Sequence, residues 1–309
     1  TNKGAVAVVD KICTIPIFTA ECKNTIFISN YATILKNECK MSYTDLDLSA
    51  GLEVYMSGHT IGNKTLYRGI KRLEAGECLL YGNNSISKKY YYTYAPWKTI
   101  FRSENQLREE FTKNCINTFK DIKKSIKERQ VVVPLSAGND SRLIASALKE
   151  FGVKNVICVS YGRKGNFETP VSKAVAERLG YKWLFLQINM KSKRNFFKSD
   201  VYKKYVKDFE SYGSIPNIQE IYEVSLLKTN YLIDDDAIII NGNSGDFISG
   251  GHVRSISNKL HNNWDKFLNK HYSLWGHIRS PDNDNYIICE LEKILSLRIK
   301  GPIDFEKYH

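Results

Sequence analysis

Residues 131–144 have the sequence VVVPLSAGNDSRLI, and this stretch decides the fold that we expect for the chain. Its first part is a short apolar, β-branched run, typical of a buried strand, and helical periodicity follows directly. Between the two, residues 136–141 combine small residues, two hydroxyl groups and one carboxylate. A turn of this kind exposes backbone N–H groups at a helix N-terminus, where phosphate-type anions bind. The alternative is a simple strand-to-helix turn in which serine and aspartate act as caps.

The carboxylate of Asp140 distinguishes this turn from other phosphate-binding loops. A carboxylate repels phosphate, so its sensible role is to hold a magnesium ion that bridges phosphate oxygens. The G-x-x-x-x-G-K-[ST] pattern is absent here, and no lysine enters the turn. The loop therefore favours phosphates that depart as a unit with their metal over transfer of a terminal phosphoryl group.

A second glycine-rich segment, NGNSGDFISGGH at residues 241–252, follows an apolar run at 237–240. It contains one carboxylate, Asp246. Two aspartates from neighbouring strand ends would meet the requirement of a shared magnesium site, whereas the alternative for this segment is a flexible loop.

Outward from these segments, strand and helix patterns alternate. We expect strands at 131–135, 156–160, 183–186 and 237–241, and helices at 141–151 and 168–179. This order predicts an α/β fold with a parallel sheet, helices on both faces and ligands at the carboxyl ends of the strands. A helix starting at Ser103 is indicated by a capping box with Gln106, and region 187–235 is helical and polar.

The chain before this region has a different pattern. Residues 1–95 are interpreted as β-structure, with strands at 5–9 and 25–28 and an aromatic edge strand at 89–94. Pro96-Trp97 marks a linker. We therefore expect two domains, 1–97 and 98–309.

Composition excludes several classes of protein. The 309 residues carry a net charge of +12 and are 42% hydrophobic, which excludes wholesale disorder. No apolar run approaches the roughly 20 residues of a membrane span, and no signal-peptide pattern opens the chain. The seven cysteines form no C-x-x-C pair, so we expect reduced thiols in a soluble, cytoplasmic protein. The histidines have no metal-ligand spacing, and a catalytic Thr1 is disfavoured.

These motifs resemble a known family. Residues 136–141 resemble the loop S-G-G-x-D-S of the N-type ATP pyrophosphatases, or PP-loop enzymes, and residues 242–251 resemble the segment G-E-G-x-D-E-x-F-G-G of their asparagine synthetase branch. Residues 159–162, Glu168 and 176–180 match in order and spacing. Residues 10–18 and 65–76 resemble the glutaminase-domain patterns D-R-x-G-x-x-P-L-Y and T-x-[FY]-x-G-I-x-x-L-x-P-G. The resemblance spans about residues 1 to 255.

The resemblance implies a PP-loop domain at 98–309 of the adenine-nucleotide α-hydrolase type, preceded by a partial glutaminase-like β-rich domain of the N-terminal-nucleophile type at 1–97. It implies an ATP-dependent amide synthetase that adenylates a carboxylate (or amide) acceptor, transfers ammonia from solution or from glutamine, and releases AMP and pyrophosphate. The cofactors would be ATP and Mg²⁺. The implied metal ligands are Asp140 and Asp246, which are also the implied catalytic residues together with Gly245. The residues implied to bind the nucleotide are Ser136, Ala137, Gly138, Asn139, Asp140, Ser141, Ser160, Tyr161, Gly162 and Gly242.

The chain also departs from the family pattern. Ala137 replaces a loop glycine, Asn243 replaces a glutamate and Phe247 replaces an acidic residue. The cysteine nucleophile of the family's glutaminase domain would lie upstream of Asp10, so an upstream half-domain is expected in the DNA before Thr1. His252 and Lys300 are weaker candidates for the site.

The changes at Asn243 and Phe247 disfavour aspartate as the acceptor, and three interpretations of function stay open. Run 161–168 also resembles relatives in bacterial surface-polysaccharide synthesis, which would act on a sugar. The loss of two carboxylates is compatible with a degenerate relative that acts as a scaffold. Lysine-rich runs at 120–127 and 191–198 are compatible with nucleic-acid binding, including tRNA, although no groove-reading or base-stacking motif accompanies them. No membrane partner is expected, and a homodimer stays open.

Overall fold

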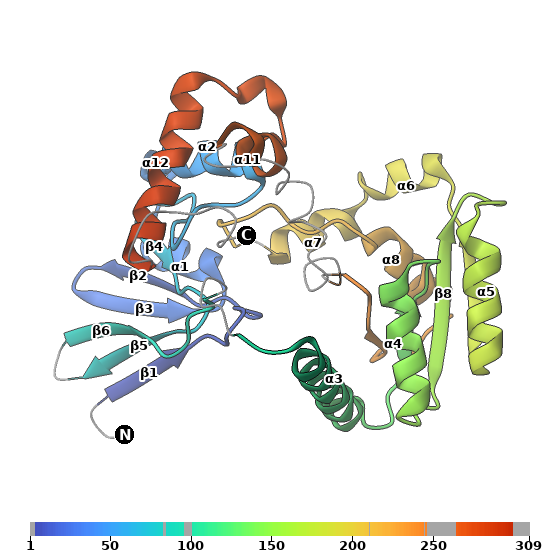
Figure 1. Ribbon diagram of the computed structural model, residues 1–309. Coiled ribbons are helices and arrows are strands. Elements are labelled where there is room, and N and C mark those ends of the chain that lie inside the picture. The colour runs from blue at the N-terminus through green and yellow to red at the C-terminus, as the bar shows by residue number, and fades with distance from the viewer. Residues whose placement is uncertain are drawn as a thin grey trace. The chain divides into compact units, whose positions relative to one another are not determined.

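The computed structural model describes residues 4–82, 85–95, 101–209, 211–243, 245 and 264–298. These residues divide into two compact units (Figure 1). Unit 1 takes its residues from 1–99, 205–217 and 253–309, and unit 2 takes its residues from 100–204 and 218–252.

Unit 2 contains a parallel four-stranded sheet in the order β10-β7-β8-β9. The strands are β7 (Val131–Pro134), β8 (Val156–Gly162), β9 (Lys182–Gln187) and β10 (Ile238–Ile239). Strand β7 pairs with β8 on one side and β10 on the other. Its carboxyl end therefore lies where the strand order reverses, the usual position of a ligand crevice in such sheets.

Alternate residues of β7 pack into two separate cores. Val131 and Val133 face one core, which the end of α3 (Glu104–Ile126), α4 (Asn139–Glu150) and α5 (Glu168–Leu179) complete. Val132 faces the other core, with Leu227 of α8 (Ile221–Thr229). Both faces of the sheet are thus covered by helices, and the expected α/β arrangement is confirmed for the described residues.

Local sequence signals position several of these elements. Helix α5 begins and ends at the residues predicted for it, and the Ser103–Gln106 capping box is present at the start of α3. Strand β10 is shorter than expected, with two residues in place of five. Region 187–235 contains α6 (Met190–Phe196), α7 (Asp200–Phe209) and α8, as its polar helical pattern predicts.

Unit 1 contains two antiparallel three-stranded sheets. One has the order β1-β5-β6 and the other the order β3-β2-β4. The strands of the first sheet are Gly4–Val8, Glu77–Gly82 and Ser85–Tyr90, and those of the second are Thr25–Ser29, Phe18–Cys22 and Ile70–Arg72, each in sheet order. The strands expected at 5–9 and 25–28 are confirmed, whereas the aromatic edge strand ends at Tyr90.

The interpretation of residues 1–95 as β-structure throughout is wrong. Two helices lie in this region, α1 (Ala32–Glu38) and α2 (Leu48–Ser57), with a 3₁₀ turn at Tyr43–Asp45. Helix α2 has clear end signals. The Asp47 carboxylate accepts hydrogen bonds from the N–H groups of Ser49 and Ala50, and Gly58 ends the helix at a φ of 86°.

The C-terminal helices belong to unit 1, which differs from the single domain expected for 98–309. Helix α11 (Trp264–His271), a 3₁₀ turn at Gly276–Ile278 and helix α12 (Pro281–Arg298) follow one another. Met56 of α2 shares a buried core with Leu268 and Ile287 of the two helices. This apolar packing between residues far apart in the sequence explains the grouping.

The expectation of reduced thiols throughout is also corrected. Cys22, at the end of β2, and Cys39, the C-cap of α1, form a disulfide. Cys13, Cys78, Cys115, Cys158 and Cys289 are free.

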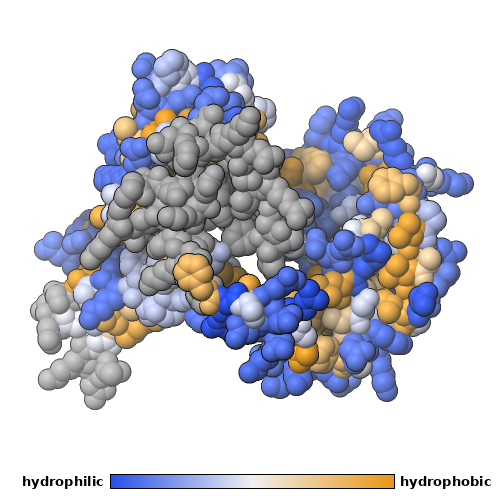
Figure 2. Space-filling view, viewed as in Figure 1, coloured by the Kyte–Doolittle hydropathy of each residue, from blue (hydrophilic) through white to orange (hydrophobic). Residues whose placement is uncertain are grey.

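The surface that Figure 2 shows is mainly hydrophilic, with smaller hydrophobic areas between the polar side chains. Within the described parts of the chain, no helix combines the length and the apolar character that crossing a bilayer requires.

Candidate functional site

The turn after β7 is the centre of the candidate site. Strand β7 ends at Pro134 and α4 begins at Asn139, so four residues connect them. The N-cap of α4 is Gly138, which has no side chain that could accept from the N–H groups of the first helical turn. These groups carry the positive end of the helix dipole and are suited to binding an anion.

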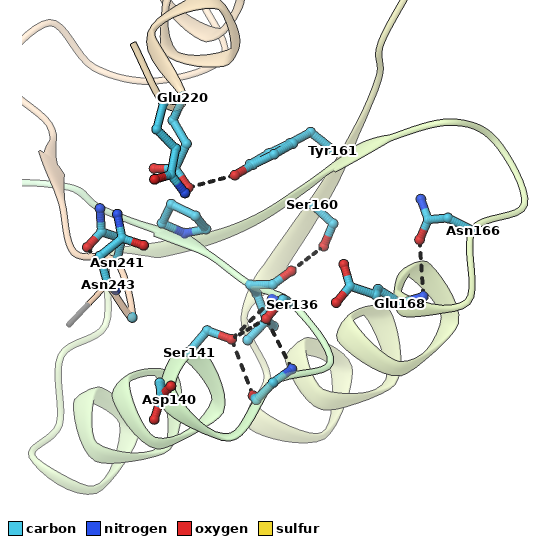
Figure 3. Close-up of a pocket in the computed structure, with 15 residues that line it drawn as sticks. Ser136, Asp140, Ser141, Ser160, Tyr161, Asn166, Glu168, Glu220, Asn241 and Asn243 are labelled. Carbon is cyan, nitrogen blue, oxygen red and sulfur yellow. Dashed lines mark hydrogen bonds between the residues drawn. The ribbon is translucent and has the colours of Figure 1, made fainter. Parts of the chain in front are cut away.

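Two serines hold this turn in shape (Figure 3). Ser141 Oγ accepts from the backbone N–H of Ser136 at 3.1 Å and lies 3.0 Å from Ser136 Oγ. Ser136 Oγ in turn accepts from the N–H of Gly138 at 3.1 Å. The closed turn presents backbone groups and hydroxyls to the same space.

That space is a cavity of about 530 Å³ at the carboxyl ends of the strands. The structure brings the following predicted nucleotide-binding residues together around it: Ser136, Gly138, Asp140, Ser141, Ser160, Tyr161 and Gly242. Three further predicted residues do not line it: Ala137, Asn139 and Gly162. The Asn139 side chain accepts a hydrogen bond from Arg142 instead.

The segment after β10 lies directly against Asp140. A Cβ added to Gly242 would come within 2.9 Å of Ser141 N and 3.1 Å of Asp140 Cβ, and one added to Gly245 would overlap the Asp140 carboxyl group. Glycine at both positions allows this close approach. The parallel pairing of Ile238 with Val131 explains why the two strand ends meet.

The second predicted metal ligand, Asp246, lies outside the described residues, as do Phe247, His252 and Lys300. A metal shared by Asp140 and Asp246 therefore stays a prediction. Gly245, predicted to be catalytic, is close to Asp140 through its backbone.

Ser160 lines the cavity, but its hydroxyl has structural partners. Its Oγ lies 2.8 Å from the carbonyl oxygen of Leu135 and 2.7 Å from Ser172 Oγ, and it accepts from Trp183 Nε1 at 3.0 Å. The hydroxyl thus ties β8 to the end of β7, to α5 and to β9. These contacts position the end of β7, which leads into the turn at 136–141.

Sequence reasoning missed Glu220, which lines the cavity opposite the turn. Tyr161 donates a hydrogen bond from its hydroxyl to Glu220 Oε1 at 2.6 Å (Figure 3). Burial raises the pKa of Tyr161, and the bond to Glu220 raises this pKa further. The only local signal near Glu220 is a polar helical pattern, which does not indicate a cavity.

The charge of the lining is acidic. Among the described lining residues there are three carboxylates, Asp140, Glu168 and Glu220, and there is no lysine, arginine or histidine. A polyphosphate in this cavity would need a cation to offset both its own charge and that of Asp140.

Comparisons with known proteins add little. No protein-family model and no curated protein matches the chain. Among solved structures, the chain is similar to an NH3-dependent NAD synthetase from Campylobacter jejuni, determined with the nitrate ion, at 14% identity and a TM-score of 0.28, over 63% of this chain and 98% of that one. It is also similar to a predicted subunit of tRNA methyltransferase from Methanocaldococcus jannaschii, at 19% identity and a TM-score of 0.25, over 55% of this chain and 88% of that one. Similarity at these TM-scores supports no inference, and the asparagine synthetase-like resemblance stays a prediction.

Proposed function

We propose that unit 2 binds ATP with Mg²⁺ in the cavity beside α4 and uses it to adenylate a carboxylate acceptor, with release of pyrophosphate. Ammonia then converts the adenylate into an amide and releases AMP. The observation that carries this proposal is the pairing, in one cavity, of an anion-binding turn with the Asp140 carboxylate and no described basic residue. The motif resemblance at 136–141 and 242–251 supports the same function.

The residues present fit a magnesium ion. Mg²⁺ usually takes one or two carboxylates together with substrate phosphates and waters, not a complete protein cage. Asp140 supplies such a carboxylate at the cavity wall, and among the described residues no group of three or more Asp, Glu, His or Cys side chains forms a closed metal site. When bound, the ion would offset charge on the phosphates.

The contribution of the chain is binding and orientation. The N–H groups at the start of α4 and the hydroxyls of Ser136 and Ser141 would hold the β- and γ-phosphates as one unit. An oxygen of the acceptor carboxylate forms a bond to the α-phosphorus, and the bond from that phosphorus to the pyrophosphate oxygen breaks. Ammonia next bonds to the acyl carbon, the bond to AMP breaks, and the nitrogen loses a proton.

The proposal names the chemical class of the acceptor and the source of the nitrogen, not individual compounds. The acceptor is a carboxylate-bearing small molecule, either an amino acid or a sugar acid of the surface-polysaccharide type. Unit 1 would represent part of a glutaminase-like domain, and ammonia from solution is the alternative nitrogen source.

ATP–pyrophosphate exchange tests the proposal. The wild-type chain is assayed with Mg²⁺ and a panel of amino acids, uronic acids and sialic-acid-like sugars, and exchange is expected with at least one member. Asp140→Ala should lower acceptor-dependent exchange and AMP release by roughly 10²- to 10³-fold, because the phosphate charge is no longer offset in the transition state.

Glu150→Gln, at the far, exposed end of the same helix, serves as the matched control and should retain the wild-type rate. A wild-type rate in Asp140→Ala would refute the assignment of Asp140. If calorimetry shows no heat when Mg·ATP is added to the wild type, the chain is a non-catalytic scaffold instead.

A further inference from the structure

The two ends of the cavity in unit 2 differ in polarity. One end presents the turn after β7, with the hydroxyls of Ser136 and Ser141 and the N–H groups of α4. At the other end, Pro134, Tyr161 and Glu220 line the cavity, and the apolar surface there comes from the rings of Pro134 and Tyr161. The same three residues adjoin a hollow of only about 10 Å³, whose remaining lining is aliphatic except for Glu223. A nucleotide has the same division, because its phosphates are polar anions and its base has two apolar faces.

Glu220 is the acceptor at the apolar end, and its position is well defined. Its Oε1 accepts from the Tyr161 hydroxyl at 2.6 Å, a contact between residues 59 positions apart. Its other oxygen, Oε2, has no hydrogen-bond partner in the part of the chain that the structure describes. One oxygen is therefore held by the protein and one is left for a ligand.

The backbone of Glu220 is itself unusual. Its φ of 64° is in the left-handed region, which non-glycine residues seldom adopt. Glu220 is the N-cap of α8, and buried Tyr222 and Leu227 anchor that helix within unit 2. The Glu220 carboxylate points towards the Tyr161 hydroxyl (Figure 3), and the anchored helix holds the backbone of Glu220 in place.

We propose that Glu220 selects the base of the nucleotide, accepting a hydrogen bond from the exocyclic amino group of a 6-aminopurine through Oε2. This inference rests on the proposed use of ATP and adds the residue that determines the choice of nucleotide. Hypoxanthine has a carbonyl oxygen at the same position, so its nucleotide would bring two acceptors together without a proton between them. Because Oε1 already accepts from Tyr161, only Oε2 is left to accept from a base. One oxygen suits the single amino group of adenine better than the edge of guanine, where a ring N–H and an amino group both donate.

The test compares the binding of Mg·ATP with that of Mg·ITP by calorimetry, with no acceptor present. ITP differs from ATP in the group at position 6. We expect the wild type to bind ATP about 10- to 100-fold more tightly than ITP, the range for a hydrogen bond to a charged group. Glu220→Gln should bring the two affinities to within about threefold, because an amide can accept from the amino group or donate to the carbonyl oxygen.

Two further variants make the result specific. Glu168→Gln removes a different carboxylate of the same cavity and should leave the ATP-to-ITP ratio as in the wild type. Glu220→Gly removes the side chain at a backbone conformation that glycine adopts without strain, so it should fold normally by circular dichroism and lose the discrimination.

Equal binding of ATP and ITP by the wild type would overturn the role of Glu220 while leaving the proposed use of ATP intact. Loss of affinity for 2′-deoxy-ATP together with full affinity for ITP would also overturn it, since the carboxylate would then bind the ribose. A wild type that binds neither nucleotide would instead remove the proposed function itself.

Discussion

Lys64 of unit 1 is the centre of a charged network with two carboxylates, those of Glu53 and Glu290. Its Nζ contacts Glu290 Oε2 at 2.6 Å and Tyr286 OH at 3.0 Å, and it forms an ion pair with Glu53. Glu53 is 0% exposed and also accepts from the N–H of Ile61 at 2.7 Å. Burial alone lowers the pKa of Lys64, but its hydrogen bonds to Glu290, Glu53 and Tyr286 outweigh burial and raise this pKa above its ordinary value.

Replacing this lysine should destabilise unit 1. Lys64→Met leaves the buried Glu53 carboxylate without its cation, and breaking such a pair costs about 3–5 kcal/mol of unfolding free energy. Urea unfolding at pH 7 measures the loss. Lys88→Met, on the exposed strand β6, is the control and should change the unfolding free energy by less than about 0.5 kcal/mol. An equal effect of the two substitutions would show that the network adds no stability.

The direction of the Lys64 pKa shift determines how the stability of unit 1 depends on pH. Because the folded pKa of Lys64 is raised, its stabilising share is fully present below the unfolded value of about 10.4 and is lost as the pH rises through the folded pKa. Burial also raises the pKa of Tyr272 to about 12. The titration of this tyrosine lowers stability at high pH in both the wild type and the variant. The stability difference between wild type and Lys64→Met should therefore shrink above roughly pH 10.4.

At the scale of elements, the disulfide between Cys22 and Cys39 joins the end of β2 to the end of α1, 17 positions along the chain. Closing a loop of this length stabilises a fold by about 3 kcal/mol in the chain-entropy model. The double variant Cys22→Ser with Cys39→Ser should lower the unfolding free energy of unit 1 by about that amount, measured in urea without reductant.

Reductant provides the internal comparison for this prediction. It should destabilise the wild type and leave the double variant unchanged, whereas Cys289→Ser, at an exposed free thiol, should behave as the wild type. Identical urea midpoints for the wild type with and without reductant would mean that the bond adds nothing to stability.

At the scale of the whole molecule, the packing within unit 1 bears on where the chain can be divided. Leu268, Tyr272 and Ile287 are each less than 5% exposed, and they pack with Met56 and Ile61 from the N-terminal part. Residues 212–213 also bond to that part, since Thr60 N donates to Gly213 O at 2.8 Å and Leu66 N donates to Tyr212 O at 2.7 Å.

A fragment that starts at residue 98 should therefore expose an apolar surface. The fragment 98–309 retains α11 and α12 without α2, so we expect it to bind the dye ANS strongly. The fragment 101–252 lacks these two helices and should bind much less dye. Low dye binding together with a cooperative thermal transition in 98–309 would support the domain boundary that sequence alone predicts.

The sequence by itself determined the features that depend on neighbouring residues. Three such features are the turn at 136–141, the bounds of α5 and the capping box of Ser103. Each follows from patterns and hydrogen bonds that span only a few positions, so each can be predicted without knowing the fold. Signals for α2 were equally local, in Asp47 and Gly58, but the surrounding β-type pattern concealed them.

Only the tertiary structure decided which distant residues meet. The contact of Tyr161 with Glu220, the disulfide from Cys22 to Cys39 and the packing of α11 and α12 on α2 all join positions far apart along the chain. Such pairs form because folding buries apolar surface from distant parts of the chain together. A periodic pattern within a short window of sequence does not indicate which distant segments will pack against each other.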